Sequence, residues 1–351
     1  MTVNNISFPN MGIRLSVKET AFTVFGRDVY WYAIIMTTAI ILGVVYVMMR
    51  RKFEGVSTDD IMDYAIFGII LGIIGARLYY VLTSLENYSD FWSIFKIWEG
   101  GLGFYGSLIG GALAVWLVSR RKKQSTLKLF DLISPAMMLG QIIGRWGNFV
   151  NGEAYGSNTV YEFFGMKFNT PNAASLPWAM HIDEIKDGVA RSSVDCQPTF
   201  LYESLWNLIG FVLINIFYKK KKFDGQIFFA YLAWYGFGRM FIEGFRTDSL
   251  YVGPVKISQL LGAVFFIGGT VMFFIGHRFL KLNGPAGSDQ KAENDPTAAV
   301  LSSAVTADEA AAVNASVETA ETTVTDAAEG ASIAKETITE ETKEPEDGKA
   351  D

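Results

Sequence analysis

The chain has 351 residues, half of them hydrophobic and 19% charged, with 27 Phe, 15 Tyr and 8 Trp. This composition is typical of a membrane protein over most of its length, and no nucleic-acid partner is expected. A single cysteine, Cys196, excludes an intramolecular disulfide framework. The net charge of −6 is unevenly divided, because residues 284–351 hold 16 acidic and 4 basic residues while the rest of the chain is net positive.

The first apolar run, residues 29–49, is predicted to be a transmembrane helix and not a cleaved signal peptide, because basic residues 50–52 follow it and no small-residue cleavage site is present. Hydropathy marks seven such runs, each with the roughly 20 residues needed to cross about 30 Å of hydrocarbon. They lie at 29–49, 61–83, 102–119, 130–150, 199–218, 225–243 and 255–278.

Basic clusters follow the first, third, fifth and seventh runs. They are RRK at 50–52, RRKK at 120–123, KKKK at 219–222 and HRFLK at 277–281. With seven spans all four clusters lie on one side of the membrane, which is the cytoplasmic side by the positive-inside rule. The sequence therefore predicts an all-α polytopic membrane protein with about seven transmembrane helices, an N-terminus outside and a cytoplasmic C-terminus.

The segments between these runs define the expected domains. Residues 1–28 form an extracytoplasmic N-terminal segment, and residues 29–282 form a seven-helix transmembrane catalytic domain whose 151–198 connection is long enough for a small extracytoplasmic head. Residues 283–351 are acidic and lack aromatic residues, so they cannot bury enough apolar surface to offset the entropy cost of ordering. A disordered cytoplasmic tail is expected.

The stretch IIGRWGNFVNGEAYG, residues 142–156, carries an arginine into an apolar run. A charge at bilayer depth costs about 2.5–3.5 kcal/mol on insertion scales, so it tends to face the protein interior and to mark a substrate or ion pathway. Arg145 and Asn148 share a helix face, and the planar guanidinium suits a phosphate diester. The alternative is that Arg145 snorkels or pairs with Glu153 as a structural contact. The candidate residues of this stretch are Arg145, Asn148, Asn151, Glu153 and Gly156.

A second cluster lies in YGFGRMFIEGFRTD, residues 235–248. Arg239, Glu243 and Arg246 follow at spacings of four and three, so they form one stripe of a helix near its outer end. Glu243 can hold one guanidinium in place while the other remains free for an anion. The alternative is a simple intrahelical ion pair at a helix end.

The third feature is WEGGLGFYGSLIGG, residues 98–111, in which glycines surround Tyr105 at the start of a membrane run. These glycines allow an irregular, close-packed helix entry that would deliver the Tyr105 hydroxyl to a site, although helix packing alone also explains them. Tyr32 fits either the site or an aromatic belt at the membrane surface. Arg77 and Glu203 are assigned to structural pairing.

These motifs together resemble the bacterial prolipoprotein diacylglyceryl transferase family. GRWGNFVNGEAYG at 144–156 is similar to the family motif of an arginine, a glycine-asparagine pair, asparagine-x-glutamate and a closing glycine. WEGGLGFYG, QPTFLYE and YGFGRMFIEGFR follow in family order, so the resemblance covers roughly residues 25–280.

The resemblance implies an enzyme of the bacterial plasma membrane that carries out the first step of lipoprotein maturation. It would transfer the diacylglyceryl group of phosphatidylglycerol to the lipobox cysteine thiol of a prolipoprotein signal peptide, form a thioether and release glycerol phosphate. Carried over by motif, the core site would contain Arg145, Asn148, Glu153 and Gly156, with Arg239 as the second essential arginine and Tyr32 as the first-helix tyrosine. Tyr105 departs from the enterobacterial members, which have histidine at this position.

The residues suit this chemistry. A phosphate-diester leaving group gathers negative charge as its carbon–oxygen bond breaks, and Arg145 and Arg239 in a low-dielectric site would stabilise that charge. Positive surroundings favour the thiolate, and Tyr105 or Glu153 would relay its proton. The expected substrate-binding residues are Tyr32, Asn148, Asn151, Gly156, Glu243 and Arg246.

Neither a metal-ligand cluster nor a nucleotide-binding loop is recognisable in the sequence, so no metal or cofactor is expected. The alternative function is an anion or lipid transporter with an arginine-lined membrane cavity. The two halves of the chain show no internal repeat, which secondary transporters commonly show. The enzyme is therefore the favoured interpretation.

Overall fold

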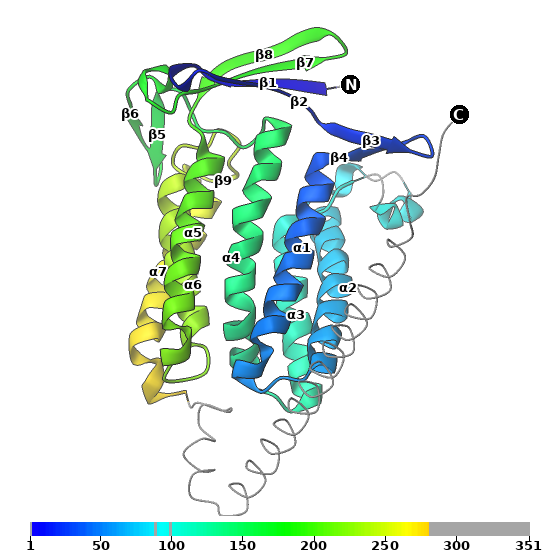
Figure 1. Ribbon diagram of the computed structural model, residues 1–351, viewed down its shortest axis with the longest axis vertical. Helices are drawn as coiled ribbons and strands as arrows, with labels where there is room; N and C mark the ends of the chain where they lie inside the picture. The colour runs from blue at the N-terminus through cyan, green and yellow to red at the C-terminus, as the bar shows by residue number, and fades with distance from the viewer. Residues whose placement is uncertain (1, 88–89, 98–99, 281–351) are drawn as a thin grey trace, which may run out of the picture. The chain divides into compact units, whose positions relative to one another are not determined.

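The computed structural model describes residues 2–87, 90–97 and 100–280 of the chain (Figure 1). This part of the chain contains seven α-helices, one for each predicted apolar run. They are α1 (Trp31–Arg50), α2 (Thr58–Thr83), α3 (Phe104–Lys122), α4 (Thr126–Asn151), α5 (Thr199–Phe217), α6 (Gln226–Ile242) and α7 (Ile257–Ile275). The acidic tail at 283–351 and its expected disorder lie outside the described residues.

Five of these helices, α1, α2, α4, α5 and α7, are long and apolar enough to cross a membrane. Helix α6 has only 17 residues, and α3 carries Arg120, Arg121 and Lys122 in its last turn. Helix α3 packs along α2 and α6 packs along α7, and these are the most extensive helix contacts in the described chain. The protein is thus a mostly helical membrane protein, and the count of seven spans remains a proposal.

Glycines allow the close packing of α2 and α3. A Cβ added at Gly106 would lie 2.1 Å from the carbonyl oxygen of Gly75, and one at Gly110 would lie 2.1 Å from that of Leu71. The two backbones therefore touch, as small residues permit between membrane helices. The packing explanation is confirmed for these two glycines of the 98–111 motif.

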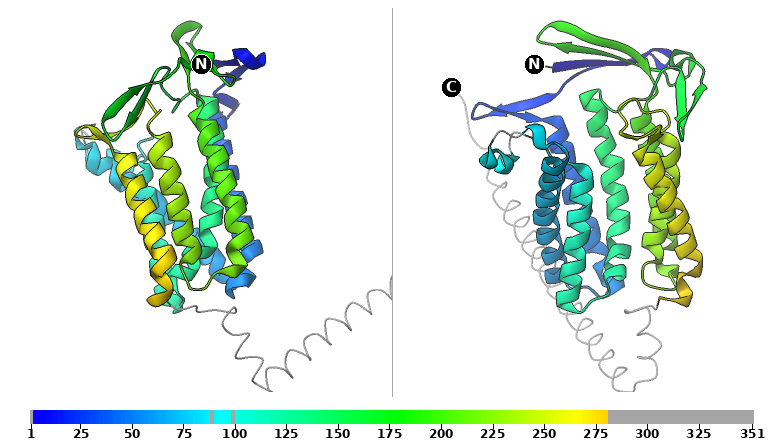
Figure 2. Two further views of the ribbon diagram at one scale, coloured as in Figure 1. Left: turned by 90° about the vertical axis from the view of Figure 1, so that its left-hand side faces the viewer. Right: turned by 180° about the vertical axis from the view of Figure 1, so that it is seen from behind.

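The all-α prediction is wrong for the segments that join the helices at one end of the bundle, where a sheet and hairpins lie (Figures 1 and 2). An antiparallel sheet of order β2-β1-β7-β8 is built from β1 (Thr2–Phe8), β2 (Ile13–Lys18), β7 (Met180–Lys186) and β8 (Val189–Cys196). Three hairpins complete the strands: β3 (Thr20–Val24) with β4 (Arg27–Tyr30), β5 (Val160–Phe163) with β6 (Met166–Asn169), and β9 (Tyr251–Val252) with β10 (Val255–Lys256). The N-terminal segment and the expected head therefore share one sheet.

This sheet has a small apolar core that contacts the helix bundle. It consists of Ile6, Met180, Ile182, Cys196 and Phe200, and Phe200 belongs to the first turn of α5. Burial raises the pKa of the Cys196 thiol to about 12, so Cys196 is a packing residue and a poor nucleophile. The core fixes the sheet against the end of the bundle where α4 ends and α5 begins.

Candidate active site

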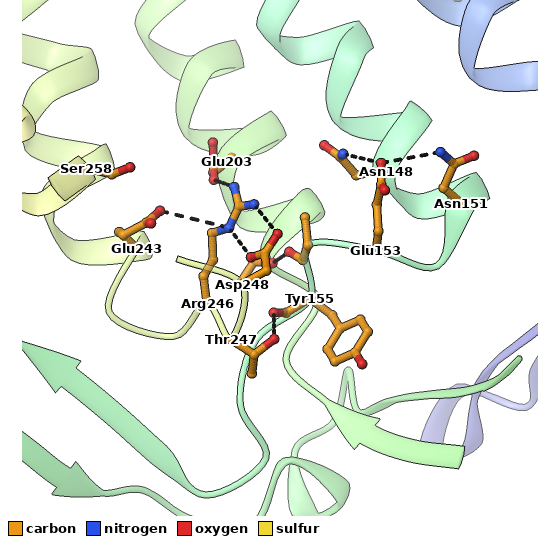
Figure 3. Close-up of polar contacts among 12 residues, drawn as sticks. Asn148, Asn151, Glu153, Tyr155, Glu203, Glu243, Arg246, Thr247, Asp248 and Ser258 are labelled. Carbon is orange, nitrogen blue, oxygen red and sulfur yellow. Dashed lines mark hydrogen bonds and ion pairs between the residues drawn. The ribbon is translucent and has the colours of Figure 1, made fainter. Parts of the chain in front are cut away.

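The candidate site begins where α4 ends, at the end of the bundle that carries the sheet (Figures 1 and 3). Gly152 ends the helix in the left-handed conformation, with φ of +62°, and its N–H donates to the carbonyl oxygen of Phe149 at 3.1 Å. The turn brings Glu153 back beside the last helical turn. There Glu153 Oε1 accepts hydrogen bonds from Asn148 Nδ2 at 3.0 Å and from Asn151 Nδ2 at 3.3 Å. The structure thus brings together the predicted two asparagines and glutamate.

Arg145 lies one turn before Asn148 on the same face of α4. Its Nη1 donates to Asn148 Oδ1 at 3.4 Å, which confirms the predicted shared face, and its Nη2 lies 2.6 Å from Glu203 Oε2 of α5. The Arg145 side chain is 18% exposed, so it is mostly enclosed yet reachable. The carboxylate that pairs with Arg145 in the described chain is Glu203.

Glu203 is the centre of the charge cluster. It is only 3% exposed, its Oε1 accepts a hydrogen bond from Arg239 Nη1 at 2.5 Å, and the same oxygen lies 3.8 Å from Arg246 Nη1. A buried carboxylate is costly unless it is paired, so Glu203 is stable here because guanidinium groups surround it. Pairing was predicted for Glu203, but its position between the two predicted arginines was not.

The second predicted cluster lies where α6 ends. Arg239 Nη2 is 2.6 Å from Glu243 Oε2, which confirms this pair. Arg246 follows in a turn, where its Nε and Nη2 donate to the Asp248 carboxylate at 3.0 and 2.9 Å, and its Nε lies 3.9 Å from Glu243 (Figure 3). The expectation that one arginine stays free was wrong, since both pair with carboxylates.

Further close contacts hold together the segments that carry the site. The Nζ of Lys256 donates to the carbonyl oxygen of Glu243 at 3.0 Å and to that of Arg246 at 2.6 Å. Lys256 is buried, and this burial lowers the pKa of its amino group. The Gly156 N–H donates to the carbonyl oxygen of Gln197 at 2.9 Å, and a Cβ at Gly156 would lie 2.6 Å from Gln197 Cβ. Gly156 is therefore a point of close backbone approach, where a larger residue would clash.

Tyr105 lies in the first turn of α3. Its hydroxyl is 3.2 Å from the Oγ of Ser258 in the first turn of α7, and it lies within electrostatic reach of Arg239. The hydroxyl thus lies beside the cluster, next to the start of α7, and no signal in the sequence singled out Ser258.

Tyr32 lies in the first turn of α1 and packs on α4. A Cβ added at Gly147 would lie 2.8 Å from the Tyr32 ring, and the hydroxyl lies within electrostatic reach of Arg145 and Glu153. Of the two interpretations of Tyr32, these contacts favour the site over the aromatic belt.

His181 belongs to the sheet. Its Nδ1 is 2.7 Å from Asp195 and its Nε2 is 3.1 Å from Asp183, and the hydrogen bond to Asp195 raises the pKa of His181. The contact with Asp195 joins β7 to β8 and gives His181 a structural role.

The cluster combines three arginines with three carboxylates, from Glu203, Glu243 and Asp248. Each guanidinium has five N–H donors, more than these contacts use, so an anion can be added to the cluster. No group of three or more His, Cys, Asp or Glu side chains in the described ranges is placed to hold a metal ion. The arrangement is suited to binding an anionic group and to stabilising charge that develops on it.

A family model described as prolipoprotein diacylglyceryl transferase matches residues 19–275. The chain belongs to the prolipoprotein diacylglyceryl transferase family. The phosphatidylglycerol–prolipoprotein diacylglyceryl transferases of Finegoldia magna and Clostridioides difficile are each 40% identical to it, over 258 and 256 residues that cover 73% of this chain and 94% of the relative. That of Streptococcus pneumoniae is 44% identical over 248 residues, 70% of this chain and 88% of the relative. The resemblance inferred from the motifs is thus confirmed, and residues 19–275 contain every candidate site residue.

Proposed function

We propose that this protein is a phosphatidylglycerol–prolipoprotein diacylglyceryl transferase that uses the arginine cluster to drive the departure of glycerol phosphate. The thiol sulfur of the prolipoprotein cysteine forms a bond to the glyceryl carbon of phosphatidylglycerol. The bond between that carbon and the phosphate oxygen breaks, and its electron pair leaves on the phosphate. The products are a diacylglyceryl thioether and glycerol phosphate, which carries one more negative charge than the diester did.

The observation that carries this proposal is the convergence of Arg145 and Arg239 on the single carboxylate of Glu203. The two arginines come from different helices, yet one buried anion fixes both, so their positions are set before a substrate arrives. Preorganised donors in a water-poor site stabilise developing charge without reorganisation, and such donors are worth about 10²- to 10³-fold each in turnover. Arg145 and Arg239 are therefore assigned to the leaving phosphate.

The remaining polar residues take the thiol proton and orient the substrates. Glu153 is exposed and hydrogen-bonded to two asparagines, so it is placed at the water-facing edge of the site where a proton can leave. The Tyr105 hydroxyl shares a hydrogen bond with Ser258 and is the second group placed to relay a proton. Substrate binding is assigned to Tyr32, Asn148, Asn151, Gly156, Glu243 and Arg246.

The reaction belongs to the extracytoplasmic side of the bacterial plasma membrane. In support, the site lies at the sheet end of the bundle, whereas the basic 120–123 and 219–222 clusters join helices at the other end (Figure 1). By the positive-inside rule, that other end is cytoplasmic. Residues 1–28, 29–282 and 283–351 are the proposed N-terminal, catalytic and tail regions.

The proposal is tested by incubating the purified full chain with phosphatidylglycerol and a lipobox peptide and following the peptide by mass spectrometry. We expect the peptide to gain a diacylglyceryl group while glycerol phosphate appears in equal amount. A peptide with serine in place of cysteine, and phosphatidylethanolamine in place of phosphatidylglycerol, serve as controls. An inserted, folded protein that yields no adduct with the cysteine peptide would refute the proposal.

A further inference from the structure

An apolar groove of about 400 Å³ lies among α5, α6 and α7. Its floor is formed by Trp206 and Trp234, whose rings stack with centroids 4.2 Å apart and planes inclined by 13°. Its walls include Phe237, Phe266, Phe273 and Phe274. Phe274 is 67% exposed, so the groove opens on the outer surface of the bundle, which faces lipid in a membrane.

The floor of the groove is preformed. Trp206 Nε1 donates to the carbonyl oxygen of Trp234 and Trp234 Nε1 donates to that of Trp206, each at 2.9 Å, so neither indole N–H needs a partner in the groove. Each indole also packs on a glycine of the facing helix, because a Cβ at Gly238 would lie 2.2 Å from Trp206 and one at Gly210 would lie 2.3 Å from Trp234. The groove therefore offers a fixed apolar surface whose volume falls in the range of about 300–1,000 Å³ that ligand sites occupy.

One end of the groove meets a basic rim. Phe274 lies in the last turn of α7, and Gly276 just beyond it packs on the ring of Phe223, since a Cβ at Gly276 would lie 2.6 Å from that ring. This contact places the α5–α6 connection beside the end of α7. Lys222 and Arg278, both exposed, flank the two contacting residues, so positive charge lies at this end of the groove.

We propose that the groove binds one acyl chain of an anionic phospholipid, whose head group contacts Lys222 and Arg278. The groove faces the acyl-chain region of the membrane. Its aromatic lining gives an acyl chain favourable contacts, and the lining has few polar groups that would lose a hydrogen-bond partner on binding. The sign of the rim charge selects an anionic head group over a zwitterionic one. The rim lies at the opposite end of α5 and α6 from Glu203 and Arg239, so the head group of this lipid is held away from the arginine cluster.

The test uses the full chain in phosphatidylcholine vesicles that contain a second lipid with brominated acyl chains, which quench tryptophan fluorescence on contact. The second lipid is either phosphatidylserine, an anionic probe whose head group differs from that of the proposed substrate, or phosphatidylcholine. Basic side chains near a head group contribute about fivefold each to the binding of anionic lipid. With two of them, we expect the serine lipid to bind roughly 25-fold more tightly than the choline lipid.

Two test variants, each with a matched control, separate the role of the rim from that of the groove. Lys222→Gln with Arg278→Gln should remove the preference for the anionic lipid, whereas Arg121→Gln with Lys123→Gln, a matched charge removal at the end of α3, should keep it. Ala230→Phe fills the groove and should reduce quenching by both lipids, whereas Val264→Phe, at a 57% exposed position of α7, should not.

Equal binding of the two lipids by the wild-type chain would overturn the proposal, as would a preference that survives the rim substitutions. Because those substitutions are at exposed positions, they test the proposal even if Ala230→Phe does not fold. Quenching is measured without turnover, so failure of this site and failure of the proposed reaction are distinguishable.

Discussion

Replacing Glu203 by glutamine keeps the shape of the side chain and removes the charge that Arg145, Arg239 and Arg246 share. Glu203 is 3% exposed and lies 2.6, 2.5 and 3.8 Å from these three guanidinium groups. Removal of one partner of a buried ion pair typically costs about 3–5 kcal/mol, because the other charge is left uncompensated. Since Arg239 and Arg246 keep other acidic partners, we expect a loss of about 3 kcal/mol in the free energy of unfolding.

The same substitution should slow the reaction. Arg145 and Arg239 belong to different helices, and without the shared carboxylate the two guanidinium groups repel each other and move apart. A displacement of about 1 Å in a catalytic constellation costs about 10²-fold in rate. Because the arginines are proposed to act on the leaving phosphate, the loss should fall on kcat, with the KM for the peptide little changed.

Glu54→Gln is the matched control. Glu54 is 2% exposed and pairs with Lys221 at 2.7 Å, but it lies at the opposite end of the bundle, where the α1–α2 connection meets the end of α5. It should lose comparable stability and retain kcat. Measurements of diacylglyceryl transfer and of thermal unfolding on both variants separate a positioning role from a purely structural one. A Glu203→Gln enzyme with the kcat of the Glu54→Gln enzyme would show that the Glu203 charge does not position the arginines.

Four further outcomes are expected. Arg145→Lys should lower kcat/KM by about 10²-fold, because an ammonium cannot replace a bidentate fork on phosphate, and wild-type turnover would contradict the assignment. Truncation after Leu282 should leave transfer unchanged, and an inserted but inactive truncated chain would make the tail part of the enzyme. His181→Asn should lower the thermal stability of the sheet more at about pH 5.5 than at pH 9. The raised pKa of His181 gives a stabilisation that is complete below about pH 6.5 and is lost as the pH rises through the folded-state pKa. Equal losses in thermal scans at the two pH values would contradict this. Tyr105→Phe should lower turnover by roughly 10²-fold or more in the transfer assay.

The helices could be predicted from the sequence because membrane helices depend on local hydropathy. Each predicted run corresponds to one helix, although α4 begins at Thr126, four residues before the predicted run at 130–150. The sheet could not be predicted in this way, since β1 pairs with β7 across more than 170 residues and its strands are polar on one face. Such pairing depends on tertiary contacts, and a turn-rich composition conceals it.

The site was partly predictable for the same reason. The spacing of Arg145 and Asn148, and of Arg239 and Glu243, specifies contacts within one helix turn, and both contacts are present. Glu203 joins these two local groups through space, and helical periodicity holds no information on which helices meet. An acidic residue at the start of a membrane run was the available signal, because a carboxylate at that depth needs a cationic partner.

The Tyr105 prediction distinguishes a chemical role of the hydroxyl from a packing role of the ring. Phenylalanine keeps the ring contact with Tyr79, whose centroid is 6.1 Å away, and removes only the group that lies 3.2 Å from Ser258. A positioned proton donor or acceptor contributes about 10²- to 10⁴-fold to turnover, whereas a neutral hydrogen bond is worth only about 0.5–1.5 kcal/mol in stability.

Ser258→Ala is the control for that hydrogen bond, because it removes the partner and leaves the Tyr105 hydroxyl in place. If the hydroxyl relays the thiol proton, Tyr105→Phe loses far more turnover than Ser258→Ala while the two lose similar stability. Tyr105→His should then restore part of the rate with a new pH dependence between about 6 and 7, where an imidazole titrates. An unchanged rate for Tyr105→Phe would remove Tyr105 from the reaction and leave Glu153, at the exposed edge of the cluster, as the remaining assigned route for the proton.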